Sequence, residues 1–376
     1  MAPRLTTERL RAATLRRQFP SVRGRGTAAV VELYRRLGPV QTQVPRSAHL
    51  VVAGRLPGVA RASVDGAFGS FAVVKGTTMR GTVHSALPDH HALSAVACRR
   101  PRALLTANHL LLDRLTPGDV DAEIERYCAD GWRERADVVA HLLAWLDEHE
   151  PVADDAKRRT TLGRSLGWGH PGLVRRPHTD RWATRTDTLH RTASAVVEQA
   201  EASEDEAVAA MVRLHLAAYG PATRKDVAWW LGGGLRRVDA AVQRLGDELV
   251  RLVGPDGVEH LDLAEPPTGG QADPGLRLLS EFDGLLVGYA GPAHDRFLAA
   301  RHLPEVWIRE NGQLIAGVLH DQRVVATWRL VVDGGGHRVD VATLSGESPL
   351  PDDLFDDQVA AVAAATGTTI TELRVT

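Results

Sequence analysis

Residues 204–263 carry the pattern that most restricts the fold of this chain: three short helices followed by a tight hairpin. Apolar residues recur at helical spacing over 208–219, and Thr223 with Asp226 forms a helix-start signal. Three consecutive glycines end that second helix, and a turn at 254–257 separates two short apolar strands. Three helices and a hairpin in about 60 residues predict a winged helix-turn-helix.

The same order is predicted twice more along the chain. In the first copy, helices are expected at 5–19 and 27–37, and a third helix is expected to start around Pro45. Two strands are expected at 73–75 and 79–84. A fainter copy has two helical segments and a wing, at 117–130, 134–149 and 172–188. We therefore predict three winged helix-turn-helix modules in tandem.

The C-terminal third of the chain has a different pattern. Apolar segments at 276–289 and 306–330 carry hairpin turns at 311–312 and 321–322, and an alanine-rich helix is expected at 359–366. A small β-rich domain therefore closes the chain. The predicted fold class is α+β, mainly α, and the predicted domains are 1–88, 89–195, 196–268 and 269–376.

Composition limits the class of protein. Hydrophobic residues make up 44% of the chain and charged residues 24%, as in ordinary globular proteins, and no apolar run approaches the ~20 residues that cross a bilayer. The first 17 residues lack the apolar stretch of a signal peptide, so we expect a cytoplasmic protein. Two cysteines, Cys98 and Cys128, are too few for a disulfide framework or a four-cysteine metal site.

Charge is distributed unevenly along the chain. Residues 1–115 hold 18 Lys and Arg against 5 Asp and Glu, a net charge of +13 within a chain whose total is −2. Such a region is typical of a face that binds polyanions such as nucleic acid. The alternative is a compositional preference for arginine, since the chain has only three lysines. That preference explains arginine over lysine but not the scarcity of acids in the first third.

Several chemistries have no motif in this chain. The phosphate loop GxxxxGK[ST], the zinc motif HExxH and the zinc-deaminase pattern are all absent from the sequence. Residues 24–29 match a dinucleotide fingerprint loosely, but they follow no predicted strand and are interpreted as a loop and helix start. His84 with His90 and His91 has no convincing metal-ligand spacing. We expect neither a metal ion nor a cofactor.

Two glutamines follow the second predicted helix, in the segment Gly38-Pro-Val-Gln-Thr-Gln-Val-Pro-Arg46. Six further segments follow in chain order: Met79-Arg-Gly-Thr-Val-His84, Gly220-Pro-Ala-Thr223, Trp230-Leu-Gly232, Leu278-Leu-Ser-Glu-Phe-Asp283, Leu285-Leu-Val-Gly288 and Val324-Val-Ala-Thr-Trp-Arg329. In this ordered set the chain resembles the AlkZ/YcaQ family of bacterial DNA glycosylases over most of its length. Its Gln-x-Gln motif is that of the AlkZ branch, although Thr42 replaces a usual apolar residue.

The resemblance implies a fold, an activity and a set of site residues. It implies tandem winged helices curved around a DNA channel, with Gln41 and Gln43 as the catalytic residues. It also implies action on bulky adducts and interstrand crosslinks, including those of antibiotics that the host makes, and hence self-resistance. Thr82 and Arg329 lie in matching segments and are candidate DNA contacts.

The two amides limit the reaction that they could support. Glutamine cannot act as a general base at neutral pH, but it can orient a water molecule and hydrogen-bond to it. That is adequate only for a good leaving group, such as a guanine alkylated at N7 or an adenine alkylated at N3, which is cationic. Strand cleavage usually needs a nucleophilic amine, and no lysine lies beside Gln41 in the sequence. We therefore predict a monofunctional glycosylase of base excision repair that leaves an abasic site.

Candidate DNA contacts are chosen by charge and position. Arg46 follows the motif, Lys75 and Arg80 fall on the first predicted wing, and the exposed face of the third helix of residues 204–263 carries three arginines: Arg236, Arg237 and Arg244. Each could equally be a solvated surface charge. His84 is either a DNA contact or a structural histidine. The expected partner is duplex DNA that carries alkylated purines, with no membrane, and the protein is expected to be a monomer.

A second function class fits the fold equally well. Tandem winged helices would also suit a non-catalytic transcription regulator or a protein that binds damaged DNA. The discriminating feature is the Gln41-Thr42-Gln43 motif, because a regulator has no need of two amides in the connection between helices.

Overall fold

The computed structural model describes residues 4–110, 112–150, 157–158, 160–161, 169–184, 188–199, 201–308, 310 and 312–376. These residues form a mixture of helices and sheets, in agreement with the predicted combination of the two. None of the described helices is both long and apolar enough to span a membrane.

A first unit of helices and strands holds the predicted Gln-x-Gln motif. Its elements, in chain order, are α2 (Thr27–Leu37), β1 (Val40–Gln41), α3 (Ser47–Arg55), α4 (Arg61–Gly69), β2 (Val74–Thr77) and β3 (Val83–Ala86). The helices enclose a core that includes Leu33, Tyr34 and Phe68, and β1 pairs antiparallel with β3. The sequence pattern did not predict α4, because this segment contains two glycines and little apolar periodicity.

The second unit has a similar order of helices and strands, without a described counterpart of α4. After the long helix α5 (Pro88–Leu110), its elements are α6 (Pro117–Tyr127), β4 (Arg133–Glu134), α7 (Arg135–His149), β5 (Leu173–Arg176) and β6 (Leu189–Thr192). The two predicted helices are confirmed as α6 and α7. The second strand of the predicted wing lies at β6, just beyond the expected limit of residue 188. The short strand β4 pairs with β6, as β1 pairs with β3.

The hairpins of these two units join into one sheet. The strand order is β1-β3-β2-β5-β6-β4, so the two units meet where β2 pairs with β5, at Gly76 and Val174. A Cβ atom on Gly76 would lie 2.8 Å from the carbonyl oxygen of Leu173, so this approach requires glycine. The seam makes β2 an interior strand. Lys75 is therefore only 2% exposed, so little of its side chain is open to DNA, and its predicted DNA contact stays a prediction.

The third unit is the segment with the clearest sequence pattern. It contains α9 (Glu204–Tyr219), α10 (Arg224–Leu231), α11 (Leu235–Leu245), β7 (Leu249–Val253) and β8 (Glu259–Leu263). Thr223 and Asp226 form a capping box at the start of α10, as predicted, and Gly232 ends that helix in a left-handed conformation. A single antiparallel β-bridge between Ala222 and Leu261 corresponds to the strands β1 and β4 of the other two units.

The predicted N-terminal helix is present as α1 (Thr7–Gln18), but it packs largely against the third unit. Leu15 and Phe19 belong to the core that α9 and α10 share. Both terminal nitrogens of Arg17, Nη1 and Nη2, donate to the carboxylate of Asp262 at 2.9 Å. Nη1 also donates to the carbonyl oxygen of Leu216. The first residues of the chain are thus fastened to a unit about 200 residues away.

The C-terminal residues form a five-stranded sheet of order β15-β14-β13-β12-β9. The strands and their helix are β9 (Arg277–Leu278), β12 (Gly317–His320), β13 (Arg323–Asp333), β14 (Gly336–Thr343), α14 (Asp356–Thr366) and β15 (Ile370–Val375). Leu50 and Ala53 of α3 pack into the core of this sheet with α14. The predicted turn at 321–322 joins β12 to β13, whereas Asn311 of the other predicted turn lies outside the described residues.

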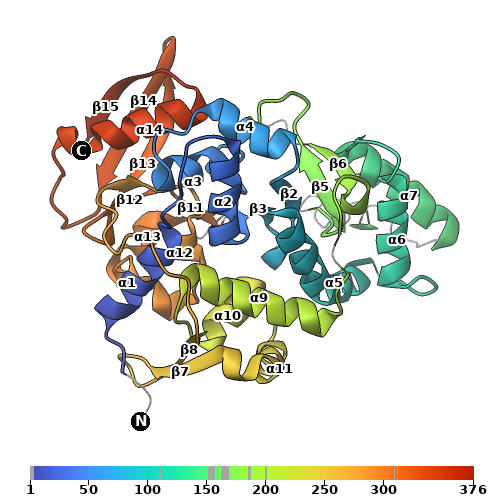
Figure 1. Cartoon of the computed structure of the whole chain (residues 1–376). Coiled ribbons are helices and arrows are strands. Elements are labelled where there is room, and N and C mark those ends of the chain that lie inside the picture. Colours follow the sequence, from blue (N-terminus) through green and yellow to red (C-terminus); the bar gives the residue numbers. More distant parts are fainter. Residues whose placement is uncertain are drawn as a thin grey trace.

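A buried ion pair joins the first unit to the segment that precedes the C-terminal sheet. Arg55 at the end of α3 donates two hydrogen bonds to Asp283, at 2.8 and 2.9 Å, and the two side chains are 2% and 1% exposed. Asp283 also accepts the amide of Leu285 and so caps α12 (Gly284–Val287). In Figure 1, α2 and β3 lie centrally, with the C-terminal sheet, helices α5–α7 and helices α9–α11 around them.

We expect Arg55→Met to lower the free energy of unfolding by about 3 kcal/mol, because it leaves a buried carboxylate without its partner. The matched control is Arg213→Met, which removes an ion pair with Glu248 whose side chains are about half exposed; its effect should be below about 1 kcal/mol. Thermal melting of both variants checks this. Equal melting temperatures would show that the buried pair does not fasten the units.

Candidate active site

The two glutamines lie where β1 leaves the first unit's sheet. Gln41 is opposite His84 in the β1–β3 pairing, and the amide of Thr42 donates to the carbonyl oxygen of Val83. The hydroxyl of Thr42 is fully buried and bonds to that of Ser85 at 2.7 Å, which satisfies the polar group at this unusual position. Side chains alternate along an extended chain, so Gln41 and Gln43 project to the opposite side from Thr42.

The hydrogen bonds fix how both amides are turned. The carbonyl oxygen of Gln41 accepts from Nη2 of Arg80 at 2.7 Å, and that of Gln43 accepts from the backbone amide of Val83 at 2.9 Å. Both partners can only donate, so the oxygen atoms must face them. Neither amide nitrogen has a partner among the described residues, and neither is fully enclosed. Gln41 is 6% exposed and Gln43 is partly exposed.

Arg80 lies in the turn between β2 and β3, and it reaches two elements. Besides binding Gln41, it donates from Nη1 to the backbone oxygen of Trp230, and its guanidinium lies 4.9 Å from the ring centre of Trp229. Burial lowers the pKa of Arg80 to about 10, so the side chain remains protonated at neutral pH. The expected phosphate contact is replaced by contacts within the protein.

His84 and Thr82 stabilise the same turn. The ring of His84 is 2% exposed, and its Nδ1 lies 3.0 Å from the backbone oxygen of Thr82, to which it donates. Burial, together with the charge of Arg80, lowers the pKa of His84 to about 3. The hydroxyl of Thr82 bonds to the backbone oxygen of Met79. His84 thus has the surroundings of a structural histidine, one of the two roles that the sequence leaves open.

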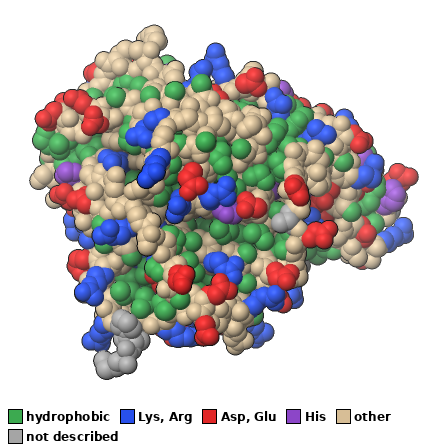
Figure 2. Space-filling model, in the orientation of Figure 1, with side chains coloured by type: hydrophobic (Ala, Val, Ile, Leu, Met, Phe, Trp, Pro, Cys, Tyr) green, Lys and Arg blue, Asp and Glu red, His purple; other side chains and the backbone are tan. Residues whose placement is uncertain are grey.

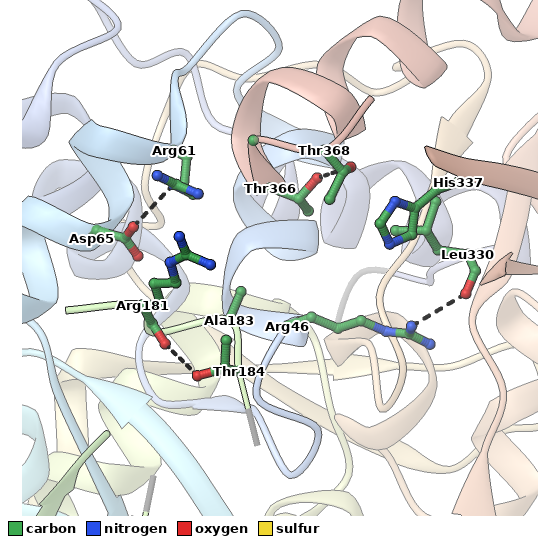
Figure 3. A pocket seen from close by; sticks show the side chains of 11 residues that line it. Arg46, Arg61, Asp65, Arg181, Ala183, Thr184, Leu330, His337, Thr366 and Thr368 are labelled. Carbon is green, nitrogen blue, oxygen red and sulfur yellow. Dashed lines mark hydrogen bonds and ion pairs between the residues drawn. The ribbon is translucent and has the colours of Figure 1, made fainter. Parts of the chain in front are cut away.

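Arg46 begins α3 and faces a cavity rather than an open surface. Its Nε and Nη2 donate to Glu281 at 2.9 and 2.7 Å, and Ser47 donates to the other oxygen of that carboxylate. Figure 3 shows Arg46 reaching toward Leu330 across this cavity of about 350 Å³. Two further arginines from other segments, Arg61 and Arg181, line the same cavity. Arg46 can thus still meet a ligand, but its charge is already balanced by Glu281.

The other predicted DNA contacts are mostly engaged in ion pairs. Arg237 bonds to the backbone oxygen of Ala97 and to Glu204, and only 19% of its side chain is exposed. Arg244 pairs with Glu206 at 3.1 Å, and Arg329 lies 3.6 Å from Asp340. Arg236 is exposed, with no ion pair in the described part of the chain. On the face in Figure 2, basic and acidic side chains are likewise intermixed.

No carboxylate of the described residues hydrogen-bonds to either glutamine. Their hydrogen-bond partners in the described structure are a guanidinium and a backbone amide. Within the described residues, no group of three or more His, Cys, Asp or Glu side chains is placed to hold a metal ion. His91, considered with His84 as a ligand, is 1% exposed, and burial lowers its pKa to about 4. The site thus offers two neutral amides, of which Gln43 is partly exposed and Gln41 is 6% exposed.

The site thus consists of two side-chain amides on a framework of helices and sheets. Residues 34–368 match the family described as DNA glycosylase AlkZ-like, and the chain belongs to that family. It is 27% identical to the interstrand DNA cross-link repair glycosylase of Streptomyces sahachiroi, over 96% of each chain. Its fold is similar to that of Streptomyces sahachiroi DNA glycosylase AlkZ, with a TM-score of 0.79 and 23% identity over 99% of each chain. The protein is thus an enzyme, not a transcription regulator.

We expect His84 to make the protein less stable in mild acid. Its folded pKa of about 3 lies below the value of about 6.5 in an unfolded chain, so only the unfolded chain takes up the proton between these limits. Its stabilising contribution is therefore complete above pH 6.5 and falls by about 1.4 kcal/mol per pH unit below it. Thermal melting at pH 5 to 8 should show a shallower acid loss for His84→Asn. Parallel curves for both proteins would contradict this prediction.

Proposed function

We propose that this enzyme hydrolyses the bond between deoxyribose and a cationic alkylpurine in duplex DNA, without cutting the strand. The observation that carries the proposal is the pair Gln41 and Gln43, whose side-chain oxygens accept hydrogen bonds within the protein while their nitrogens bond to no described residue. No carboxylate bonds to either amide in the described structure. A site of this kind can orient water but cannot deprotonate it strongly.

The leaving group must therefore supply most of the driving force. In an N7-alkylguanine nucleotide the purine already carries a positive charge. When the C1′–N9 bond breaks, its electron pair neutralises that ring, and positive charge develops on the sugar. Water then adds to C1′ and gives its proton to solvent, which leaves a neutral alkylguanine and an abasic site. Each amide oxygen retains a second lone pair that can accept a hydrogen bond from this water.

The proposed DNA-binding framework is a set of three winged helix-turn-helix modules around a duplex channel. Among the described residues each unit has a helix, a short pairing segment, one or two further helices and a closing hairpin, and the short segment pairs with the last strand of the hairpin. The proposed domains are three winged-helix modules at 1–88, 89–195 and 196–268 and a β-rich domain at 269–376. Among the basic candidates, Arg236 is the most available for a phosphate, because it is exposed and outside any ion pair in the described structure.

The substrate is proposed to extend to bulky adducts and interstrand crosslinks. The Streptomyces sahachiroi relative is named an interstrand DNA cross-link repair glycosylase. A crosslinked base cannot be turned out of the duplex freely, so it requires a site that meets the nucleotide in place. Gln43 is partly exposed, which suits such a site. We infer a cytoplasmic monomer that protects its host from a DNA-alkylating antibiotic.

Gln41→Ala and Gln43→Ala should each lower the single-turnover rate of base release about 100-fold, the usual effect of removing one well-placed polar group. The substrate is duplex DNA with N7-methylguanine, and released base is measured by mass spectrometry. Gln313→Ala, an exposed glutamine on β11 (Gln313–Leu314), is the matched control and should keep the wild-type rate. If both motif variants match the wild type, the site assignment fails although the activity stands.

The product should be an abasic site in an unbroken strand. Lys75 is buried on β2, and the hydrogen bonds of the two glutamines among the described residues come from Arg80 and Val83 rather than from an amine that could form a Schiff base. Denaturing electrophoresis should show breaks only after alkali treatment, and borohydride should trap no protein–DNA adduct. A trapped adduct would overturn the hydrolytic mechanism while leaving the glycosylase activity intact.

A further inference from the structure

We propose that Arg80 is a positioning residue, which holds the amide of Gln41 in the one orientation that the reaction needs. This proposal rests on the proposed function of Gln41. The bond from Nη2 of Arg80 to the oxygen of Gln41 is 2.7 Å long and joins the turn between β2 and β3 to β1. Because a guanidinium has no acceptor, the amide cannot exchange its oxygen and nitrogen without losing this bond.

Arg80 is itself fixed by the third unit. Its other terminal nitrogen, Nη1, donates to the backbone oxygen of Trp230, and its guanidinium lies over the ring of Trp229. Both partners belong to α10, about 150 residues further along the chain. Three contacts on one planar group leave it little freedom to rotate. The orientation of Gln41 is therefore set by an element outside its own unit.

The backbone around Arg80 is shaped for this reach. Arg80 has a φ of 55° and a ψ of 17°, a left-handed conformation that non-glycine residues seldom adopt. A Cβ atom on Gly232, at the end of α10, would lie 2.9 Å from the backbone nitrogen of Arg80. The turn can approach α10 this closely only because that residue is glycine. Such strain persists where the surroundings hold it in place, as Gln41 and α10 do here.

The expected chemical effect is on the amide that the substrate meets. With its oxygen turned to Arg80, Gln41 presents its NH₂ group and one remaining lone pair outward. The adjacent positive charge also polarises the amide, so its NH₂ group becomes a stronger donor. Without Arg80 the amide would rotate, and the water-orienting geometry would be populated only part of the time.

A double-mutant cycle tests the proposal. Arg80→Met, Gln41→Ala and the double variant are compared by single-turnover base release from N7-methylguanine duplex and by affinity for a duplex with an abasic analogue. We expect Arg80→Met to slow base release at least 10-fold, with affinity changed less than 2-fold. The double variant should be no slower than Gln41→Ala alone. Arg374→Met, which removes an exposed pair with Glu372 on β15, is the matched control.

Other results would overturn the proposal. Weaker binding with an unchanged rate would make Arg80 a phosphate contact, and multiplied losses in the double variant would make it a general structural residue. If Arg80→Met does not fold, Arg80→Lys replaces it. The lysine keeps the charge but not the planar fork, so base release should again slow and remain coupled to Gln41.

An NMR measurement that does not depend on enzyme activity separates this proposal from the proposed function. In protein labelled with ¹⁵N-glutamine, the side-chain NH₂ signal of Gln41 is assigned by its loss in Gln41→Ala. It should shift and broaden in Arg80→Met, while the Gln43 signal stays in place. An unmoved Gln41 signal overturns the positioning role even if the wild type releases base. A wild type that releases no base overturns the proposed function while this test remains valid.

Discussion

The short pairing of β1 with β3 is the interaction on which the site depends. It sets Gln41 opposite His84 and brings the turn that carries Arg80 beside the motif. The strand is only two residues long, so its pairing alone is weak. It persists because buried groups hold it on both sides: the hydroxyls of Thr42 and Ser85 bond to each other, and the neutral ring of His84 closes the turn. The arrangement of the two motif amides thus rests on a well-satisfied polar core.

Much of the helical framework and the location of the motif could be predicted from the sequence. Capping residues at 223–226 and glycine at 232 gave reliable helix limits, because these signals act locally. The motif glutamines were found by their place in an ordered set of segments. Burial of Lys75 could not be foreseen, because it follows from pairing between strands about 100 residues apart. Helix α4 was missed because tertiary packing around Phe68 outweighs its weak periodicity.

The local excess of basic residues predicted the surface charge of the folded protein poorly. The excess of arginine in residues 1–115 suggested an open basic face, but several of these side chains bind acids from distant segments, as Arg17 does with Asp262 and Arg46 with Glu281. The net charges of the two parts of the chain therefore compensate across interfaces. An arginine buried with a carboxylate is costly to separate, so these pairs contribute to how the units are arranged. Sequence reveals how many charges there are but not which are paired.

The joined sheet has a consequence for how the protein can accommodate a distorted duplex. Strands bonded across the seam at Gly76 cannot turn relative to each other without breaking the ladder, so the first two units move together. The third unit has its own two-stranded sheet, so no shared strand pairing joins it to the first two units among the described residues. The boundary with the third unit is where Arg80 meets α10. A movement at this boundary would therefore also disturb the contacts of Arg80, the side chain that bonds to Gln41.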